Sequence, residues 1–265
     1  SVRINDFFYS EKLRLETRKE LGVTQEKIFI FTGRLSYQKN IHLLVKHFLE
    51  HAEATKANDK LLLFGNFDDL GDPFVNHRTT PGEYFHQVQR ILQNHPKRNQ
   101  IEFKGMANSK TLNAYYNASD YFIGLSMHND EDFGMSIAES SICGLPSILT
   151  AWGGFHDFNF PGNHFLKVKI EDQKEVMLQP LAQMLSGPNT ADRSLISKKA
   201  HARFSTDSTT QNLKKILNSH AQTFEGFSNL FHKVQKSSQI SNKMFINFDR
   251  QLNSLYREIY DSYIG

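Results

Sequence analysis

The sequence predicts an α/β protein with a Rossmann-like, doubly wound parallel sheet and helices on both faces of that sheet. Two observations lead to this prediction: short apolar runs alternate with amphipathic stretches, and the runs end in glycine or another turn residue. A strand buried on both faces reads as a continuous apolar run, whereas a helix on such a sheet repeats its apolar residues every three or four positions. Strand followed by helix, repeated with short connections, is typical of a parallel sheet.

Short apolar runs mark the predicted strands. Residues 27–31 read Lys-Ile-Phe-Ile-Phe before Thr-Gly, and residues 61–64 read Leu-Leu-Leu-Phe before Gly. Such runs are typical of strands that are buried on both faces. The predicted strands are 27–31, 61–64, 100–103, 121–125, 146–149 and 164–168. We expect no strand after Glu171, because the pattern stops there.

The stretches between these runs have helical spacing. Apolar residues within 40–51 recur three and four positions apart, which places them on one face of a helix. Gly144 and Pro146 are expected to stop the helix predicted before them. Residues 68–81 are rich in Gly, Pro and Asp and are predicted to form a loop. The predicted helices are 40–51, 84–92, 109–118, 134–143, 176–185 and 193–204.

The strand pattern divides the chain into two parts. Residues 1–204 are predicted to form one Rossmann-like domain, and residues 205–265 a C-terminal helical extension. Apolar residues near the end of the chain step by three and four positions, and such a stripe needs a cover. We expect it to pack on the preceding domain, with packing on another domain as the alternative. The stripe consists of Phe245, Phe248, Leu252, Leu255 and Ile259.

Composition excludes several classes of protein. With 39% hydrophobic residues the 265-residue chain can bury a sizeable core, and its net charge of +3 comes without the polybasic tract expected of a nucleic-acid-binding protein. No apolar run is long enough for a transmembrane helix. Cys143 is the single cysteine, which leaves no disulfide framework or thiolate metal site and suits the cytoplasm. The polar start of the chain leads us to expect that it was cut from a longer protein.

The loop after the first predicted strand has the composition of a phosphate-binding site. Gly33 lets the backbone turn close to a ligand, and the planar guanidinium of Arg34 can donate two hydrogen bonds to a phosphate. Lys39 lies at the expected start of a helix, where a cation opposes the helix dipole unless an anion compensates. The loop matches neither the P-loop nor the dinucleotide-binding glycine pattern. It predicts a bound diphosphate, with two ordinary surface cations as the alternative.

Two glutamates flank the start of a later predicted helix. Glu131 lies in the loop after the strand at 121–125, and Glu139 lies about one and a half turns into the helix that begins near Gly134. Backbone N–H groups at a helix start can hold an anion, and the carboxylates can accept hydrogen bonds from hydroxyl groups. A nucleotide sugar carries hydroxyl groups at both ends and phosphates between them. The spacing alone leaves open that Glu131 satisfies the helix dipole and that Glu139 is solvated.

Taken together, these motifs resemble the C-terminal domain of glycosyltransferase family 4, or group 1. The resemblance extends from Asn5 to Phe204. That family has the GT-B fold, in which two Rossmann-like domains face each other across a cleft, and it contains retaining enzymes that use nucleotide-sugar donors. The resemblance implies that residues 1–204 are the donor-binding half, without the N-terminal acceptor domain. It rests on Gly33-Arg34…Lys39-Asn40, on Glu131-Asp132-Phe133-Gly134…Glu139, on Cys143-Gly144-Leu145-Pro146 and on Gly153-Gly154.

The resemblance also implies roles for individual residues. Arg34 and Lys39 would neutralise the diphosphate and the charge that develops on it as the glycosidic bond breaks, so neither a metal nor a cofactor is implied. Glu131 would hold sugar hydroxyls beside the backbone of the helix start, and Glu139 would bind the ribose. The implied catalytic residues are Arg34, Lys39 and Glu131. The implied donor-binding residues are Gly33, Arg34, Lys39, Met106, Leu112, Glu131, Phe133, Gly134, Met135 and Glu139.

Neighbouring residues are expected to be structural. We expect Trp152 to pack rather than line the sugar pocket, and Cys143 to be a small buried hydrophobe. His128 and Asp130 are expected to be solvated loop residues. The histidines on the helix predicted at 40–51 are not expected to bind a metal.

The function implied by the resemblance is metal-independent transfer of a hexosyl group from a nucleoside-diphosphate sugar, with retention, to an unknown acceptor. We expect the domain alone to be inactive, because a sugar-bearing or lipid acceptor would bind the N-terminal half. The expected location is the cytoplasm, with a peripheral position at the membrane as an alternative for the full-length protein. A non-catalytic nucleotide-sugar-binding module and a sugar-nucleotide epimerase on the same fold are the alternative functions.

Overall fold

The computed structural model describes residues 5–71, 80–128, 133–171, 174–177, 180–187 and 189–218. The chain divides into two compact units, residues 1–205 and 206–265. The first unit contains the sheet and its helices. The second is described as one helix, α8 (Thr206–Asn218).

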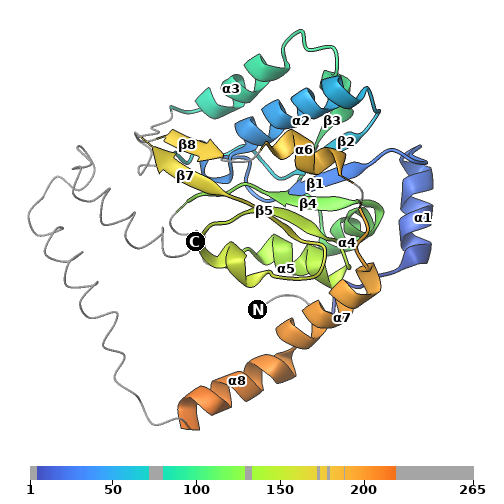
Figure 1. Cartoon of the computed structure of the whole chain (residues 1–265), viewed down its shortest axis with the longest axis vertical. Helices are drawn as coiled ribbons and strands as arrows, with labels where there is room; N and C mark the ends of the chain where they lie inside the picture. Colours follow the sequence, from blue (N-terminus) through green and yellow to red (C-terminus); the bar gives the residue numbers. More distant parts are fainter. Residues whose placement is uncertain are drawn as a thin grey trace, which may run out of the picture. The chain divides into compact units, whose positions relative to one another are not determined.

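A six-stranded parallel sheet forms the centre of the first unit (Figure 1). Its order is β3-β2-β1-β4-β5-β6, and every neighbouring pair is parallel. The chain winds outward from β1 to β3, returns to place β4 beside β1, and winds outward again to β6, so the predicted doubly wound fold is confirmed. The strands are β1 (Ile28–Thr32), β2 (Lys60–Phe64), β3 (Ile101–Gly105), β4 (Tyr121–Gly124), β5 (Ser147–Thr150) and β6 (His164–Leu166).

Helices cover both faces of this sheet (Figure 1). One face carries α2 (Ile41–Thr55), α3 (Glu83–Leu92) and α6 (Leu181–Ser186). The other carries α4 (Ser109–Ala118), α5 (Met135–Ile142) and α7 (Arg193–Phe204), while α1 (Glu11–Glu20) packs against α4. Short 3₁₀ turns are η1 (Tyr37–Lys39), η3 (Arg98–Gln100) and η4 (Gly153–Asp157).

The apolar pattern predicts the core correctly where it is continuous. Every residue of β1 is buried, and the apolar face of α2 is buried against the sheet. That face consists of the residues whose spacing predicts the helix, Ile41, Leu44, Val45, Phe48 and Leu49. Burial of such side chains is the main stabilising contribution to a fold of this kind.

Two sequence predictions are wrong after residue 166. Lys174–Met177 is a strand, β8, which pairs antiparallel with β7 (Val168–Glu171), so strands do continue beyond Glu171. The helix predicted at 176–185 therefore starts only at α6, directly after Pro180. A proline restricts the residue before it to extended conformations and cannot donate a backbone hydrogen bond, so it favours a helix start at this point.

Helix α1 has no counterpart among the predicted helices because it lacks an apolar stripe. Ser10 caps its start by accepting a hydrogen bond from the Leu13 amide, and its buried side chains are those of Thr17 and Arg18. Such a helix is held by polar contacts, which the apolar pattern does not detect.

The predicted packing of the C-terminal extension stays a prediction. The stripe at residues 245–259 lies outside the described residues. Among the residues that the structure describes, no helix is both long and apolar enough to cross a membrane.

One carboxylate joins the starts of β1 and β4. The Oδ2 atom of Asp120 accepts hydrogen bonds from the Ile28 amide at 2.8 Å and from Arg18 at 3.0 Å, and Oδ1 accepts one from Arg14 at 2.6 Å. The Asp120 amide in turn donates to the carbonyl of Ile28 at 2.7 Å. These bonds fix β4 beside β1, where the winding of the sheet reverses.

Arg14 and Arg193 stabilise the end of α4. Arg14 donates to the carbonyl groups of Asn117, Ala118 and Ser119, three groups that lack partners within the helix. Arg193 donates to the carbonyl of Ser119 from the other side, and burial lowers its pKa to about 10, so that it stays charged at neutral pH. Cations at a helix C-terminus also interact favourably with its dipole.

We predict that Asp120→Asn lowers the free energy of unfolding by about 3 kcal/mol, because two nearly buried guanidinium groups lose their counter-charge. Urea denaturation of the chain measures this value. Glu16→Gln, which breaks the exposed Lys12–Glu16 pair, is the matched control and should cost less than about 1 kcal/mol. Equal effects of the two substitutions would contradict the structural role assigned to Asp120.

Candidate functional site

The loops that follow β1 and β2 lie side by side at the carboxyl edge of the sheet, next to the point where the winding reverses. Backbone hydrogen bonds continue past the strands: Gly33 donates to the Phe64 carbonyl at 3.0 Å, and Leu35 to the Asn66 carbonyl at 2.9 Å. Open parallel sheets bind ligands at this position. The first loop is therefore held in place by backbone contacts and not by its side chains alone.

Gly65 permits this close approach. A Cβ atom at this position would lie 1.9 Å from the carbonyl oxygen of Gly33, and the φ of Gly65 is +133°. Its amide also donates to the carbonyl of Gly105 at 2.9 Å, which ties the loop after β3 to the other two. Only glycine fits both the conformation and the space.

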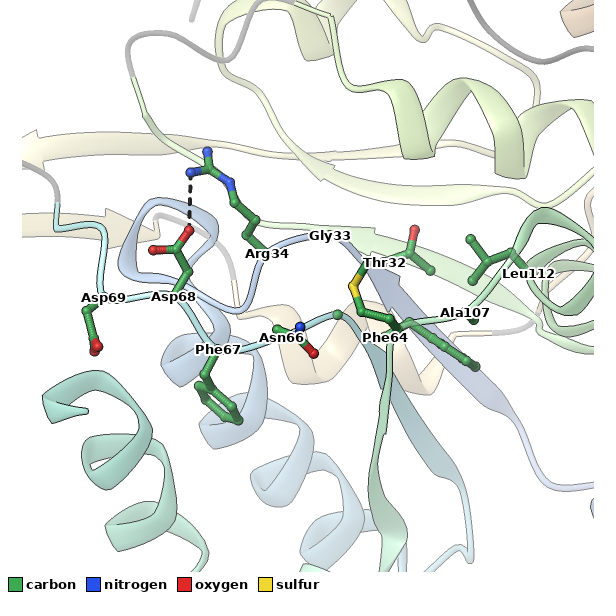
Figure 2. Close-up of a pocket in the computed structure, with 12 residues that line it drawn as sticks. Thr32, Gly33, Arg34, Phe64, Asn66, Phe67, Asp68, Asp69, Ala107 and Leu112 are labelled. Atoms are coloured by element: carbon green, nitrogen blue, oxygen red, sulfur yellow. Dashed lines mark hydrogen bonds and ion pairs between the residues drawn. The ribbon is translucent and has the colours of Figure 1, made fainter. Parts of the chain in front are cut away.

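A cavity of about 760 Å³ opens between the three loops (Figure 2). Four predicted donor-binding residues line it, from the ends of β1 and β3 and from α4. Met106 is 74% exposed, while Leu112 reaches the cavity from α4 and is half-buried. The cavity thus joins an apolar end to a charged end, where Arg34 lies beside Asp68 and Asp69. The four residues are Gly33, Arg34, Met106 and Leu112.

A small cavity of about 60 Å³ adjoins the first and shares Thr32 and Gly33 with it. Lys39 and Gly134 line this second cavity, so the structure brings the predicted cation and the start of α5 together. Lys39 ends the turn η1, and Asn40, with a left-handed φ of 54°, leads into α2. The predicted position of Lys39 at a helix start is confirmed.

Phe133 and Met135 are the chain neighbours of Gly134, but they do not line either of the two cavities. Phe133 is 41% exposed, and its ring packs edge-on against those of Phe158 and Phe204. Met135 is 43% exposed at the first turn of α5. The donor-binding roles of these two residues stay predictions.

Glu139 belongs to α5 and is half-buried. The hydroxyl of Tyr116 is hydrogen-bonded to Thr32, which lines both cavities. Burial raises the pKa of Tyr116 well above its ordinary value, and the charge of Glu139 raises it further. The ribose-binding role of Glu139 stays a prediction. Glu131 and Asp130 lie outside the described residues, and their roles stay predictions.

Arg34 has two acceptors in this structure. Its Nη1 atom lies 3.4 Å from Oδ2 of Asp68, and its Nη2 atom lies 3.3 Å from Oε1 of Gln38 (Figure 2 shows the pair with Asp68). Sequence reasoning missed both partners. Asp68 follows a strand within four residues, so the rule that ligands bind at strand ends could have identified it; Gln38 carried no such signal.

The remaining predicted neighbours are structural. Trp152 is 4% exposed and donates to the His128 carbonyl at 3.1 Å, which confirms that it packs. Cys143 is buried as predicted, donates to Asn113, and has a pKa raised by burial. His128 is half-buried.

The histidines of α2 do not converge. His42 contacts the Tyr84 hydroxyl, His47 contacts Glu50, and His51 is buried with Asp59 at 2.8 Å. Within the described part of the chain, no three His, Cys, Asp or Glu side chains gather where they could hold a metal ion.

We predict that Gly65→Ala lowers the free energy of unfolding by at least about 3 kcal/mol. The added methyl group would clash with the backbone of Gly33, and alanine would be strained at the φ of this position. Gly22→Ala is the control: its φ is +64° but its Cβ would meet nothing within 4 Å, so it should cost only about 1 to 2 kcal/mol. Urea denaturation separates the two. A loss at Gly65 no larger than that at Gly22 would mean that the loops can move apart.

Two comparisons with known sequences agree on the family. The profile of the family "Glycosyl transferases group 1" matches residues 14–201. An uncharacterized glycosyltransferase, MJ1607, of Methanocaldococcus jannaschii is 26% identical over 150 residues, which are 56% of this chain and 34% of that protein. The alpha-monoglucosyldiacylglycerol synthase of Streptococcus pneumoniae is 31% identical over 134 residues, or 50% of this chain and 26% of that protein. The chain thus spans about a third or less of the length of these relatives.

Solved structures share the fold. Alr3699/HepE of Anabaena, in complex with UDP and glucose, aligns with a TM-score of 0.61 and 21% identity over 82% of this chain and 55% of that chain. The C-terminal domain of a group 1 glycosyl transferase, LpcC, of Francisella tularensis aligns with a TM-score of 0.54 and 16% identity over 80% of this chain and 98% of that one. Because the family profile matches more than half of the chain, the chain belongs to the group 1 glycosyl transferases.

Proposed function

We propose that this chain is the donor-binding domain of a retaining glycosyltransferase and that it binds a nucleoside-diphosphate sugar in the two adjoining cavities. One observation supports this above all: Arg34 and Lys39 line neighbouring cavities that meet at Gly33. Two cations on either side of a backbone turn suit a diphosphate. The larger cavity has the volume that small-molecule sites commonly have.

Each part of the donor then has a place. The base would lie at the apolar end of the large cavity, against Met106 and Leu112, and the diphosphate at Gly33 between the two cations. The ribose would lie on the side of Thr32, with Glu139 as the ligand of its hydroxyl groups. The sugar would lie at the start of α5, with Glu131 as the ligand of its hydroxyl groups.

The proposed chemistry depends on charge. Negative charge develops on the diphosphate as the bond to the sugar breaks, and fixed cations stabilise that charge more in the transition state than in the ground state. Arg34 and Lys39 would supply this stabilisation without a metal ion or another cofactor. The acceptor, bound by a partner domain, would then take the sugar with retention of its anomeric configuration.

The structural relatives support a first choice of donor. The structure of Alr3699/HepE was solved with UDP and glucose. We propose a UDP-hexose on this basis, with GDP- and ADP-sugars as the alternatives to be tested directly.

We predict that the chain binds one of UDP, GDP and ADP saturably, with the same affinity in magnesium and in EDTA, as measured by calorimetric titration. Arg34→Ala/Lys39→Ala should weaken this binding by at least about 100-fold, because each cation contributes a charge-assisted hydrogen bond of about 1.5–3 kcal/mol.

Lys46→Ala/Arg90→Ala is the matched control, since it removes the same charge from exposed positions on α2 and α3. An affinity that is unchanged in the Arg34/Lys39 variant, or equally reduced in the control, would rule out the assigned phosphate site. Turnover of the full-length protein with a sugar acceptor would separate a transferase from a non-catalytic binding module.

A further inference from the structure

We propose that Asp68 competes with the donor diphosphate for Arg34 and thereby weakens the retention of the nucleoside diphosphate product. The inference rests on the proposed function, because it assumes that Arg34 binds the diphosphate. It adds a residue that acts through Arg34 and that has no assigned role in the proposed chemistry.

The backbone places Asp68 beside Arg34. Leu35 and Phe67 form a parallel bridge beyond the ends of β1 and β2, and the Asp68 amide donates to the Leu35 carbonyl at 3.1 Å. Arg34 and Asp68 thus flank a single backbone ladder, although 34 residues separate them in the chain. The backbone pairing of the two loops therefore places Arg34 and Asp68 next to each other.

The carboxylate is also oriented. Its Oδ1 atom accepts a hydrogen bond from the Leu70 amide at 3.0 Å, which directs Oδ2 to the guanidinium of Arg34 at 3.4 Å. Gln38 holds the other Nη atom, and its own Nε2 atom donates to the Gly71 carbonyl at 3.2 Å. Both terminal nitrogen atoms of Arg34 therefore have acceptors within the chain, and Figure 2 shows the pair with Asp68.

This contact is weak enough to be displaced. Arg34 is 50% exposed and Asp68 is 32% exposed, and exposed pairs of this kind contribute little. A diphosphate carries more charge than a carboxylate and can accept two shorter hydrogen bonds from the same guanidinium. The diphosphate should displace Asp68 from Arg34, but its net affinity for the site is reduced by the free energy needed to break the Arg34–Asp68 pair. Since affinity differences at one site lie mostly in dissociation, Asp68 should speed release of the product.

The neighbouring carboxylate provides a control. Asp69 lines the same cavity, but its Oδ2 atom accepts from the Gly82 amide at 2.6 Å and its Oδ1 atom from the Tyr84 amide at 3.3 Å. It stabilises the start of α3 instead of contacting Arg34. Asp69→Asn therefore removes the same charge from the same loop without breaking the Arg34–Asp68 pair.

The test is calorimetric titration of UDP, GDP and ADP, and of the corresponding nucleosides, into the wild-type chain, Asp68→Asn and Asp69→Asn. We expect Asp68→Asn to bind the preferred nucleoside diphosphate about twofold to fivefold tighter, which is the range for the loss of one exposed pair. The nucleoside should bind with unchanged affinity, because it does not need Arg34. Asp69→Asn should show no gain.

Unchanged or weaker binding of the nucleoside diphosphate by Asp68→Asn would overturn the proposal, and weaker binding would mean that Asp68 orients Arg34 for the phosphate. An equal gain for the nucleoside, or for Asp69→Asn, would also overturn it. A crystal structure of the complex in which Arg34 stays paired with Asp68 would do the same. If thermal denaturation shows that Asp68→Asn is not folded, Asp68→Ser takes its place. The serine hydroxyl can still accept a hydrogen bond from the Leu70 amide. Absence of binding to the wild-type chain would instead contradict the proposed function.

Discussion

The carboxylate of Asp120 holds the two halves of the sheet together. It accepts hydrogen bonds from two guanidinium groups and from the first amide of β1, while the Asp120 amide donates to a carbonyl of β1. The contact lies at the amino ends of β1 and β4, opposite the edge where the cavities open. Because β1 and β4 are the strands between which the winding reverses, their pairing sets where the loops of each half meet. The position of the site depends on this contact at the far end of the strands.

At the opposite edge, the backbone itself continues the order of the sheet. The ladder between β1 and β2 extends into their loops, and Gly65 is the residue that lets them approach. The backbone that carries a side chain on such a loop is fixed by the same kind of hydrogen bonds as a strand. Arg34 is positioned in this way, whereas Lys39 is positioned by the turn ahead of α2.

The proposed function places two opposing demands on the electrostatics of the site. Cations are needed where the charge of a leaving group develops, yet the same cations would retain a charged product. As proposed above, a carboxylate on a neighbouring loop weakens the retention of the product without removing the stabilisation of the leaving group, provided that its contact with the cation is weak and exposed. The distances and exposures of Arg34 and Asp68 fit that condition.

The sequence by itself determined the alternation of strand and helix, the buried face of α2 and the order of the segments that carry Gly33, Arg34, Lys39 and Glu139. These features depend on local periodicity and on residues adjacent in the chain. Only the tertiary structure revealed α1, which polar contacts hold, and the β7–β8 hairpin, which cross-strand pairing holds. It also decided that Asp68 faces Arg34, since partners so far apart in the chain meet only after the sheet has formed. Pairing across a sheet is a long-range choice, and no local pattern encodes which side chains it will bring together.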